Sequence, residues 1–369
     1  MAVPLLDLNT QNQAHADALQ AAFSRVLGSS QFILGREVAD FEAAVAQRLG
    51  VAECIGVSSG TDALLLALMA LDVGPGDEIL CPTYTFFATA GCISRLGAEP
   101  VFVDVHAESF NIDLEDAAAK ISSRTKAILP VHLYGQSADM DAVMALAEAH
   151  NLKVVEDCAQ AMCARWKDAE VGTIGEFGTY SFFPTKNLGG FGDGGLLTTN
   201  DAGLAQRARI LRAHGSKPKY YHKQVGGNFR LDALQAALLG VKMGSLDNYI
   251  SQRRENADRY LQPFAAAGLG ESIILPAQMD HCWHTWNQFT LRVQGGRRDA
   301  LREHLRDRDI ASEIYYPLSL HQQACFQELP SRHCPVSEQL ALECLSVPIY
   351  PELTNALQDE VVGAVAEFF

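Results

Sequence analysis

The sequence predicts an α/β protein in which a mainly parallel sheet is followed by a smaller α+β domain. Two patterns predict this fold: short runs of Val, Ile and Leu alternate with helical segments, and the pattern changes after residue 230. Continuous apolar runs are typical of strands that are buried on both faces, as parallel strands between helices are. We place the boundary near residue 245, so that residues 1–245 form a large domain and residues 246–369 a small C-terminal domain.

The large domain is expected to begin with helices and to continue into the sheet. Residues 12–27 and 37–49 have the periodicity of amphipathic helices, which end at Gly28 and Gly50. Strand-like runs then occur at 54–59, 78–83, 100–105, 127–133, 153–157, 179–183 and 195–199. The loop between the last two runs is too short for a crossover helix, so we expect that pair to be antiparallel.

The C-terminal part has a different pattern. Residues 231–264 predict one or two long helices. A strand at 286–293 and helices around 298–307 and 355–369 follow. This mixture predicts the small α+β domain.

Composition and charge disfavour several classes of partner. The formal net charge is −15, which argues against nucleic acid, because phosphate contacts need clustered Lys and Arg. The chain starts without a basic segment followed by an apolar one, and no apolar run reaches the roughly 18 residues of a membrane span. Nine scattered cysteines without a CxxC pair predict reduced thiols. We therefore expect a cytoplasmic protein without a metal site.

Polar residues at the ends of the predicted strands indicate where a site would lie, because ligands of open α/β sheets bind at the carboxyl ends of strands. After the run at 54–59, Gly60 allows close backbone approach and Thr61 begins a strongly apolar helix. The free N–H groups and the dipole of that helix favour a phosphate. Taken alone, Thr61 or Asp62 is also a good helix N-cap.

Two further strand ends carry an acid and a lysine. Asp157 ends the run at 153–157 and suits a cationic ring nitrogen, although alone it fits a helix cap or a metal carboxylate as well. Lys186 lies between an apolar strand and a Gly-rich stretch. Burial there would lower its pKa and make it an amine nucleophile, although a solvated loop lysine is the commoner case.

An aromatic residue completes the set. Phe86 follows the strand at 78–83, where it would stack on a flat ring or simply pack in the core. A phosphate cradle, an acid, a lysine and an aromatic ring at one edge of one sheet are what pyridoxal phosphate (PLP) requires. The combination therefore predicts a PLP site.

Five strings make the match specific. In order, they are SSGTDAL, PTYTFFATA, VVEDCAQAMCA, SFFPTKNLGGFGDGG and GGNFRLDALQAA. The sequence resembles, over nearly its whole length, the fold-type I PLP aminotransferases that act on nucleotide-linked keto-sugars, the DegT/StrS-like family. The resemblance implies a large domain with a mixed, mainly parallel seven-stranded sheet between helices, and a small α+β C-terminal domain.

The resemblance also implies roles for the residues around the ring. Lys186 matches the lysine that holds PLP as a Schiff base, and Asp157 matches the partner of the pyridine nitrogen. Gln160 matches a residue that hydrogen-bonds the ring hydroxyl, and Phe86 matches the aromatic that stacks on the ring. Because Lys186 is a lysine rather than the histidine found in a dehydratase subset of the family, the resemblance favours transamination.

The phosphate of the cofactor has its own predicted partners. Gly60, Thr61 and Ser181 match the phosphate cradle. Asn228 matches a phosphate ligand that the neighbouring subunit supplies, so the resemblance implies a homodimer with shared active sites.

The substrate is less well defined by the sequence. The resemblance implies L-glutamate as amino donor and a nucleotide-linked keto-sugar as acceptor. Phe183 before the proline and the KNLG…GDGG form favour a 3-keto sugar, with a 4-keto sugar as the alternative. His214, Tyr316 and His321 match positions near the mouth of the site. A stretch with Lys217, Lys219, Lys223 and Arg230 either binds the nucleotide diphosphate or is a solvated loop.

Two other functions stay open at this point. One is a PLP-binding regulator that does not turn over glutamate, and the other is a different fold-type I enzyme. A desulfurase would need a mobile catalytic cysteine, and an amino-acid aminotransferase would need an arginine for the substrate carboxylate. The sequence shows no clear candidate for either residue.

Overall fold

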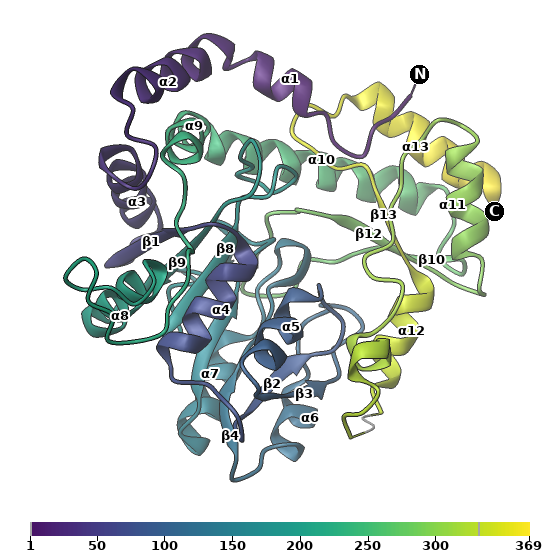
Figure 1. Cartoon of the computed structure of the whole chain (residues 1–369). Helices are drawn as coiled ribbons and strands as arrows, with labels where there is room; N and C mark the ends of the chain where they lie inside the picture. Colours follow the sequence, from purple (N-terminus) through teal and green to yellow (C-terminus); the bar gives the residue numbers. More distant parts are fainter. Residues whose placement is uncertain (1, 331–332) are drawn as a thin grey trace.

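The computed structural model describes residues 2–330 and 333–369, and a seven-stranded sheet lies at its centre (Figure 1). The strand order is β1-β9-β8-β5-β4-β2-β3. These strands are β1 (Glu53–Val57), β2 (Glu78–Pro82), β3 (Glu99–Val103), β4 (Thr125–Ile128), β5 (Lys153–Asp157), β8 (Phe177–Ser181) and β9 (Gly195–Thr199). Each overlaps one of the seven predicted runs, so the predicted sheet is confirmed.

Strand β9 is the exception to the parallel order. It pairs antiparallel with both of its neighbours, β1 and β8, whereas the remaining pairs are parallel. The short connection between β8 and β9 therefore joins an antiparallel pair, as the sequence predicts.

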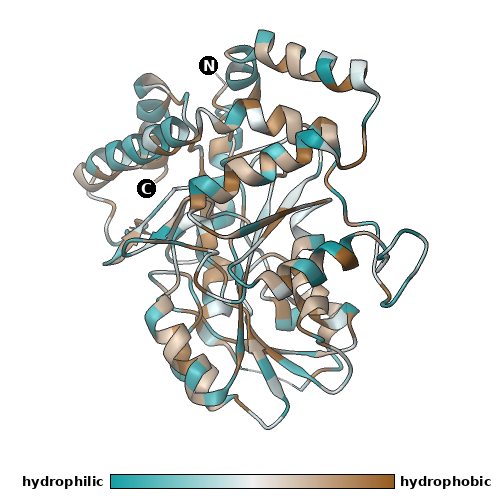
Figure 2. Cartoon of the chain, turned by 90° about the vertical axis from the view of Figure 1, so that its left-hand side faces the viewer, coloured by the Kyte–Doolittle hydropathy of each residue, from teal (hydrophilic) through white to brown (hydrophobic). Residues whose placement is uncertain are grey.

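Helices cover both faces of the sheet, which explains why its strands are apolar on both sides. In Figure 2 the strands are coloured mainly as hydrophobic, whereas the outer sides of the helices carry hydrophilic residues. Along β1, Cys54 packs with one layer and Ile55 with the other. The helices on the Ile55 side are α4 (Gly60–Ala70), α5 (Ala88–Arg95) and α8 (Ala202–Arg212). Those on the other side are α3 (Arg36–Leu49), α6 (Leu114–Ala119), α7 (Met140–His150) and α9 (Ala233–Met243).

The N-terminal helices differ in part from the prediction. Instead of one helix over 12–27, the chain forms α1 (Leu8–Gln13) and α2 (Ala16–Ser29), and α2 ends at Ser30 in a left-handed conformation rather than at Gly28. Helix α1 exists because the Asp7 carboxylate accepts hydrogen bonds from the N–H groups of Asn9 and Thr10. Helix α3 ends at Gly50, as predicted.

The C-terminal part contains the predicted elements and others that the sequence pattern missed. Helix α10 (Leu246–Ala266) follows α9, so the stretch after residue 231 forms two helices. A three-stranded sheet has the order β10 (Ile273–Ile274), β12 (Phe289–Val293) and β13 (Cys344–Val347), and α11 (Arg298–Arg306) and α13 (Asn355–Phe368) pack against it. Helix α12 (Pro335–Glu343) and β13 were not predicted.

Several contacts join residues on opposite sides of residue 245. The domain boundary expected there stays a prediction. Val3 pairs with Ile310. A small third sheet joins β11 (Cys282–Trp283) to β6 (Arg165–Trp166) and β7 (Ala169–Glu170). Short 3-10 turns complete the fold at η1 (Leu133–Gly135), η2 (Leu320–Gln322) and η3 (Ala324–Phe326). Among the helices of the described residues, none is long and apolar enough to cross a membrane.

A buried carboxylate ties the C-terminal part to the central sheet. Asp104, which follows β3, accepts hydrogen bonds from the N–H groups of Val336 (3.0 Å) and Ser337 (2.8 Å) at the start of α12. The Ser337 hydroxyl donates to the same carboxylate at 2.5 Å. Asp104 thus satisfies the free N–H groups of a helix that lies more than 200 residues later in the chain.

We expect Asp104→Ala to lower the stability of the fold by about 2–4 kcal/mol, because several buried donors lose their acceptor at once. Asp139→Ala is the matched control, since Asp139 caps α7 through a single exposed bond to Ala142 N and should cost only about 1 kcal/mol. Thermal unfolding followed by circular dichroism measures both variants. Equal unfolding midpoints for the two variants would contradict the role of Asp104 in attaching α12 to the central sheet.

Candidate active site

A cavity of about 480 Å³ opens at the carboxyl edge of the central sheet. Segments that follow β1, β2, β4, β5 and β8 form its walls, together with residues 315 and 316 from the C-terminal part. The predicted cofactor residues that line it are Gly60, Thr61, Phe86, Asp157, Gln160, Ser181 and Lys186. The fold thus brings together every predicted cofactor residue except Asn228.

Lys186 lies in a tight turn after β8. Its N–H donates to the carbonyl of Phe183 at 2.8 Å, and the glycine-rich loop folds back so that Gly189 packs against Pro184 without room for a side chain. Burial lowers the pKa of the Lys186 ammonium to about 8, although the negative charge of Asp157 opposes this shift. Lys186 is therefore neutral, as a nucleophile requires, more often near neutral pH than a solvated lysine is.

Asp157 is the buried acid of the site. Its carboxylate accepts hydrogen bonds from the Thr89 hydroxyl (3.0 Å) and from Ala159 N (3.1 Å). Burial raises the pKa of this carboxyl, while these two bonds and the charge of Lys186 lower it. A cation placed beside Asp157 would stabilise its charged form in the same way.

The predicted phosphate cradle lies at the start of α4. Ser59 accepts the N–H of Asp62 at 3.0 Å, and the first N–H groups of α4 have no partner inside the helix. A side chain on Gly60 would approach Ser181 Cβ to 2.8 Å. Only glycine therefore allows the helix start and Ser181 to lie side by side, with donors that suit a phosphate.

Gln160 presents a fixed donor to the cavity. Its Oε1 accepts the N–H of Tyr134 at 2.8 Å, and its Nε2 lies 3.4 Å from the hydroxyl oxygen of Tyr316. Phe86 lines the cavity with 57% of its surface exposed, so a flat ligand ring can stack on it. Sequence reasoning missed Tyr134, which bonds to Gln160 through its backbone N–H and to the carbonyl of Tyr315 through its hydroxyl.

The predicted substrate residues do not lie together. Tyr316 lines the cavity, whereas His214, Asn228 and His321 do not. The ring of His321 lies between the hydroxyl of Thr83 (2.7 Å) and the carboxylate of Glu338 (3.1 Å), so both of its nitrogens have partners within the chain. The substrate roles of His214 and His321 stay predictions.

A second buried group next to Asp157 has the composition of a metal site. Glu156 and His132 lie 3.1 Å apart with Cys158 close by. The Glu156 carboxylate already accepts three N–H groups within 172–175, and His132 Nδ1 accepts the N–H of Ala138. Hydrogen bonds thus account for these side chains, which brace β5 beneath the site.

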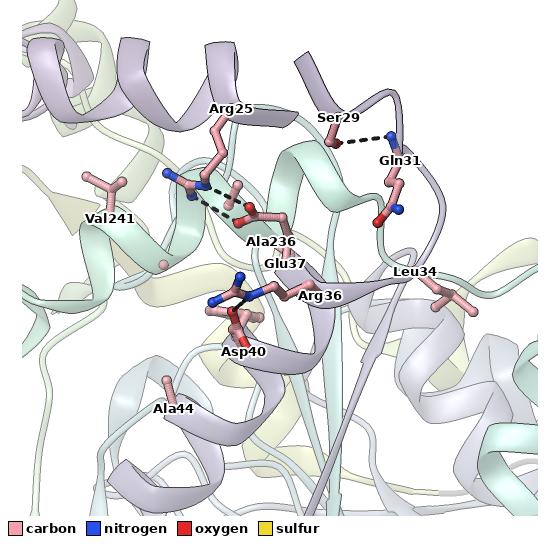
Figure 3. A pocket seen from close by; sticks show the side chains of 13 residues that line it. Arg25, Ser29, Gln31, Leu34, Arg36, Glu37, Asp40, Ala44, Ala236 and Val241 are labelled. Atoms are coloured by element: carbon pink, nitrogen blue, oxygen red, sulfur yellow. Dashed lines mark hydrogen bonds and ion pairs between the residues drawn. The ribbon is translucent and has the colours of Figure 1, made fainter. Parts of the chain in front are cut away.

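A larger groove of about 650 Å³ lies elsewhere, between α2, α3 and α9 (Figure 3). Its rim carries the ion pairs Arg25–Glu37 (2.7 Å) and Arg36–Asp40 (3.2 Å). None of the predicted site residues lines it. Volume alone therefore does not locate the chemistry of this protein.

Comparison with known proteins agrees with the geometry. The profile of the DegT/DnrJ/EryC1/StrS aminotransferase family matches residues 13–366. The chain belongs to this family. The resemblance that the sequence motifs indicated is thereby confirmed.

Two curated relatives of this family have different names. The chain is 46% identical, over 100% of its length and 99% of the relative, to a pleiotropic regulatory protein of Geobacillus stearothermophilus. It is 44% identical, over 99% of its length and 96% of the relative, to a UDP-N-acetyl-3-dehydro-alpha-D-glucosamine 3-aminotransferase of Acidithiobacillus ferrooxidans.

Solved structures in the family have the same fold. The structure of S. venezuelae DesV in complex with a ketimine intermediate has a TM-score of 0.95 and 41% identity, and the match covers 100% of this chain and 98% of that one. The Bacillus subtilis protein NtdA, solved with bound cofactor PMP, has a TM-score of 0.90 and 29% identity, over 98% of this chain and 82% of that one. The predicted fold type I and the predicted cofactor, PLP, are confirmed.

The chain is thus a PLP-dependent aminotransferase, and its cavity fits the cofactor. Gly60, Thr61 and Ser181 suit the phosphate, and Asp157 suits the ring nitrogen. Lys186 is the only cationic side chain among the residues that line the cavity. The individual roles of these residues are predictions that substitution can test.

We expect Lys186→Ala to lose covalent attachment of PLP, because the other residues of the cavity offer no amine. The matched control is Lys242→Met: Lys242 is also buried and burial lowers its pKa to about 8, but its Nζ donates to the carbonyl of Gly189 outside the cavity. Borohydride reduction followed by mass spectrometry should add the cofactor mass to the wild type and to Lys242→Met only. Detection of the added cofactor mass on Lys186→Ala would refute the assignment of Lys186 as the point of attachment.

Proposed function

We propose that this aminotransferase moves the amino group of L-glutamate to the keto carbon of a nucleotide-linked 3-keto sugar, and that it works as a homodimer. The observation that carries the transfer chemistry is the placement of Lys186 and Asp157 in one cavity at the carboxyl edge of the sheet. The 3-keto substrate is supported by the similarity to the A. ferrooxidans 3-aminotransferase. A 4-keto sugar stays the alternative.

Each residue of the cavity has a chemical task in this proposal. When bound, PLP withdraws electrons from the carbon that carries the amino group. Asp157 keeps the ring nitrogen protonated through its negative charge, and Phe86 covers the face of the ring. The Nζ of Lys186, once released, takes the proton from Cα of glutamate and returns it to the cofactor carbon that receives the nitrogen. The same group moves the proton back when the keto-sugar has replaced 2-oxoglutarate.

Two features of the surface support a dimer with shared sites. Asn228 is exposed and lies outside the cavity of its own chain. The loop that follows α8 extends from the body at the left of Figure 1, with Tyr220 78% and Val225 89% exposed. With Tyr221 also exposed, several apolar side chains gather on one loop, as is typical of a contact surface.

The distribution of positive charge also supports a dimer with shared active sites. A sugar nucleotide brings a diphosphate, yet Lys186 is the only cation that lines the cavity. Lys217, Lys219 and Lys223 lie exposed on the extended loop. A partner subunit that inserts this loop beside the cavity would supply the missing positive charge.

One observation favours a second function. The G. stearothermophilus relative is named a pleiotropic regulatory protein, which is consistent with a ligand-binding role. A regulator would bind PLP without turning over glutamate. The similarity to the A. ferrooxidans 3-aminotransferase favours turnover.

We expect L-glutamate alone to convert the PLP-loaded protein to its amino form with release of one equivalent of 2-oxoglutarate, followed by amination of a 3-keto sugar nucleotide. Cofactor absorbance measures the first step, and the mass of the amino-sugar measures the second across a panel of 3-keto and 4-keto sugars. No change in absorbance with glutamate would refute the proposed donor and favour the regulator. Amination of 4-keto sugars only would refute the 3-keto assignment.

Shared active sites predict complementation between two defective subunits. In a mixed dimer of Lys186→Ala and Asn228→Ala, one of the two sites receives intact residues from both chains. Activity should therefore reappear after the two variants are dissociated and reassembled together. If mixing restores nothing, although light scattering shows a dimer, Asn228 does not act across the interface.

A further inference from the structure

The hydroxyl of Tyr316 has an unused proton that faces the cavity. Its oxygen accepts a hydrogen bond from Gln160 Nε2 at 3.4 Å. The proton of that hydroxyl has no acceptor among the described residues. Since Tyr316 lines the same cavity as Lys186, the proton is free for a ligand.

The side-chain amide of Gln160, which is the neighbouring donor, is held in one orientation. The N–H of Tyr134 uses the Oε1 of Gln160, so the amide turns its Nε2 toward Tyr316. The cavity therefore has two donors at one corner, the amide N–H of Gln160 and the hydroxyl of Tyr316. Two adjacent donors suit an oxygen that carries negative charge.

Two buried tyrosines hold Tyr316 in place. The hydroxyl of Tyr84 donates to the carbonyl of Tyr315 at 2.7 Å, and the hydroxyl of Tyr134 donates to the same carbonyl. The N–H of Tyr316 donates to the Tyr84 oxygen at 3.1 Å. Two rings pack against Tyr316, with centroids 6.1 Å away for Phe86 and 6.3 Å for Tyr84. The donor is thus positioned before any ligand arrives.

The surroundings of the Tyr316 hydroxyl keep it protonated, so that it can act as a hydrogen-bond donor. Burial raises the pKa of Tyr316, and the negative charge of Asp157 raises it further. The phenol therefore stays protonated near neutral pH. It does not act as a base.

We propose that Tyr316 donates a hydrogen bond, together with Gln160, to the ring oxygen of bound PLP, and thereby lowers the pH at which the cofactor attached to Lys186 gives up its proton. This inference rests on the proposed attachment at Lys186 and on the proposed role of Gln160, and it does not depend on the identity of the sugar.

The expected effect follows from the charge on that oxygen. When the cofactor attached to Lys186 loses its proton, more negative charge rests on the ring oxygen. A donor to the oxygen stabilises this form more than the protonated form. Removal of the Tyr316 hydroxyl should therefore raise the midpoint of the titration.

The test is a pH titration of cofactor absorbance in the PLP-loaded protein without substrate. Tyr316→Phe keeps the ring and its packing and should raise the midpoint by about one pH unit, the size expected for one hydrogen bond to a charged group. Tyr315→Phe is the matched control, because Tyr315 lines the same cavity but its hydroxyl bonds to Gln288. This control should keep the wild-type midpoint.

Three outcomes would overturn the inference. An unchanged midpoint in Tyr316→Phe with a higher KM for the sugar would make Tyr316 a substrate contact. An equal shift in Tyr315→Phe would show a general disturbance of the cavity. A wild type without any pH-dependent band would overturn the attachment at Lys186, and would thus separate the failure of that proposal from a failure of Tyr316 alone.

Discussion

The burial of an acid and a base in one cavity is the constraint on which the site depends. Water would stabilise the charges of Asp157 and Lys186 separately, but the cavity does not, so burial raises the pKa of the carboxyl and lowers that of the ammonium. Each charge then depends on the other. A cofactor that brings a cationic ring nitrogen and reacts with the amine satisfies both groups at once.

The rest of the fold keeps this pair in place. Strand β5 carries Asp157 at its end, and the buried Glu156–His132 pair behind it uses its hydrogen-bonding capacity within the chain. The antiparallel strand β9 lets the chain return immediately after the Lys186 loop, without a crossover helix. Gly60 allows α4 to start directly beside Ser181. Local packing thus places the start of α4, the end of β5 and the segment after β8 at one edge of the sheet.

The sequence predicted the sheet and several residues that the structure brings together in one cavity, because both depend on local patterns. Buried strands are continuous apolar runs, and the residue after each run is known once the run is found. The break between α1 and α2 was missed because Ala14 and His15 form it without Gly or Pro. Tyr84 and Tyr134 were missed for a different reason: their partner is the carbonyl of Tyr315, and no pattern of side chains reveals a bond to a distant backbone atom.

The hydrogen bonds that Asp104 accepts restrict how the protein can move. They fasten the start of α12 to the end of β3, and the bonds of His321 to Thr83 and Glu338 fasten the same region to the end of β2. Helix α12 is therefore attached to the large domain as well as, through the Arg292–Glu343 ion pair and the bond of Arg298 to the Ala341 carbonyl, to the part that carries β12. A hinge that swings the whole C-terminal part away would have to break both attachments. Substrate exchange is easier to reconcile with a rigid entrance, whose width the side chains set, than with a domain that opens and shuts.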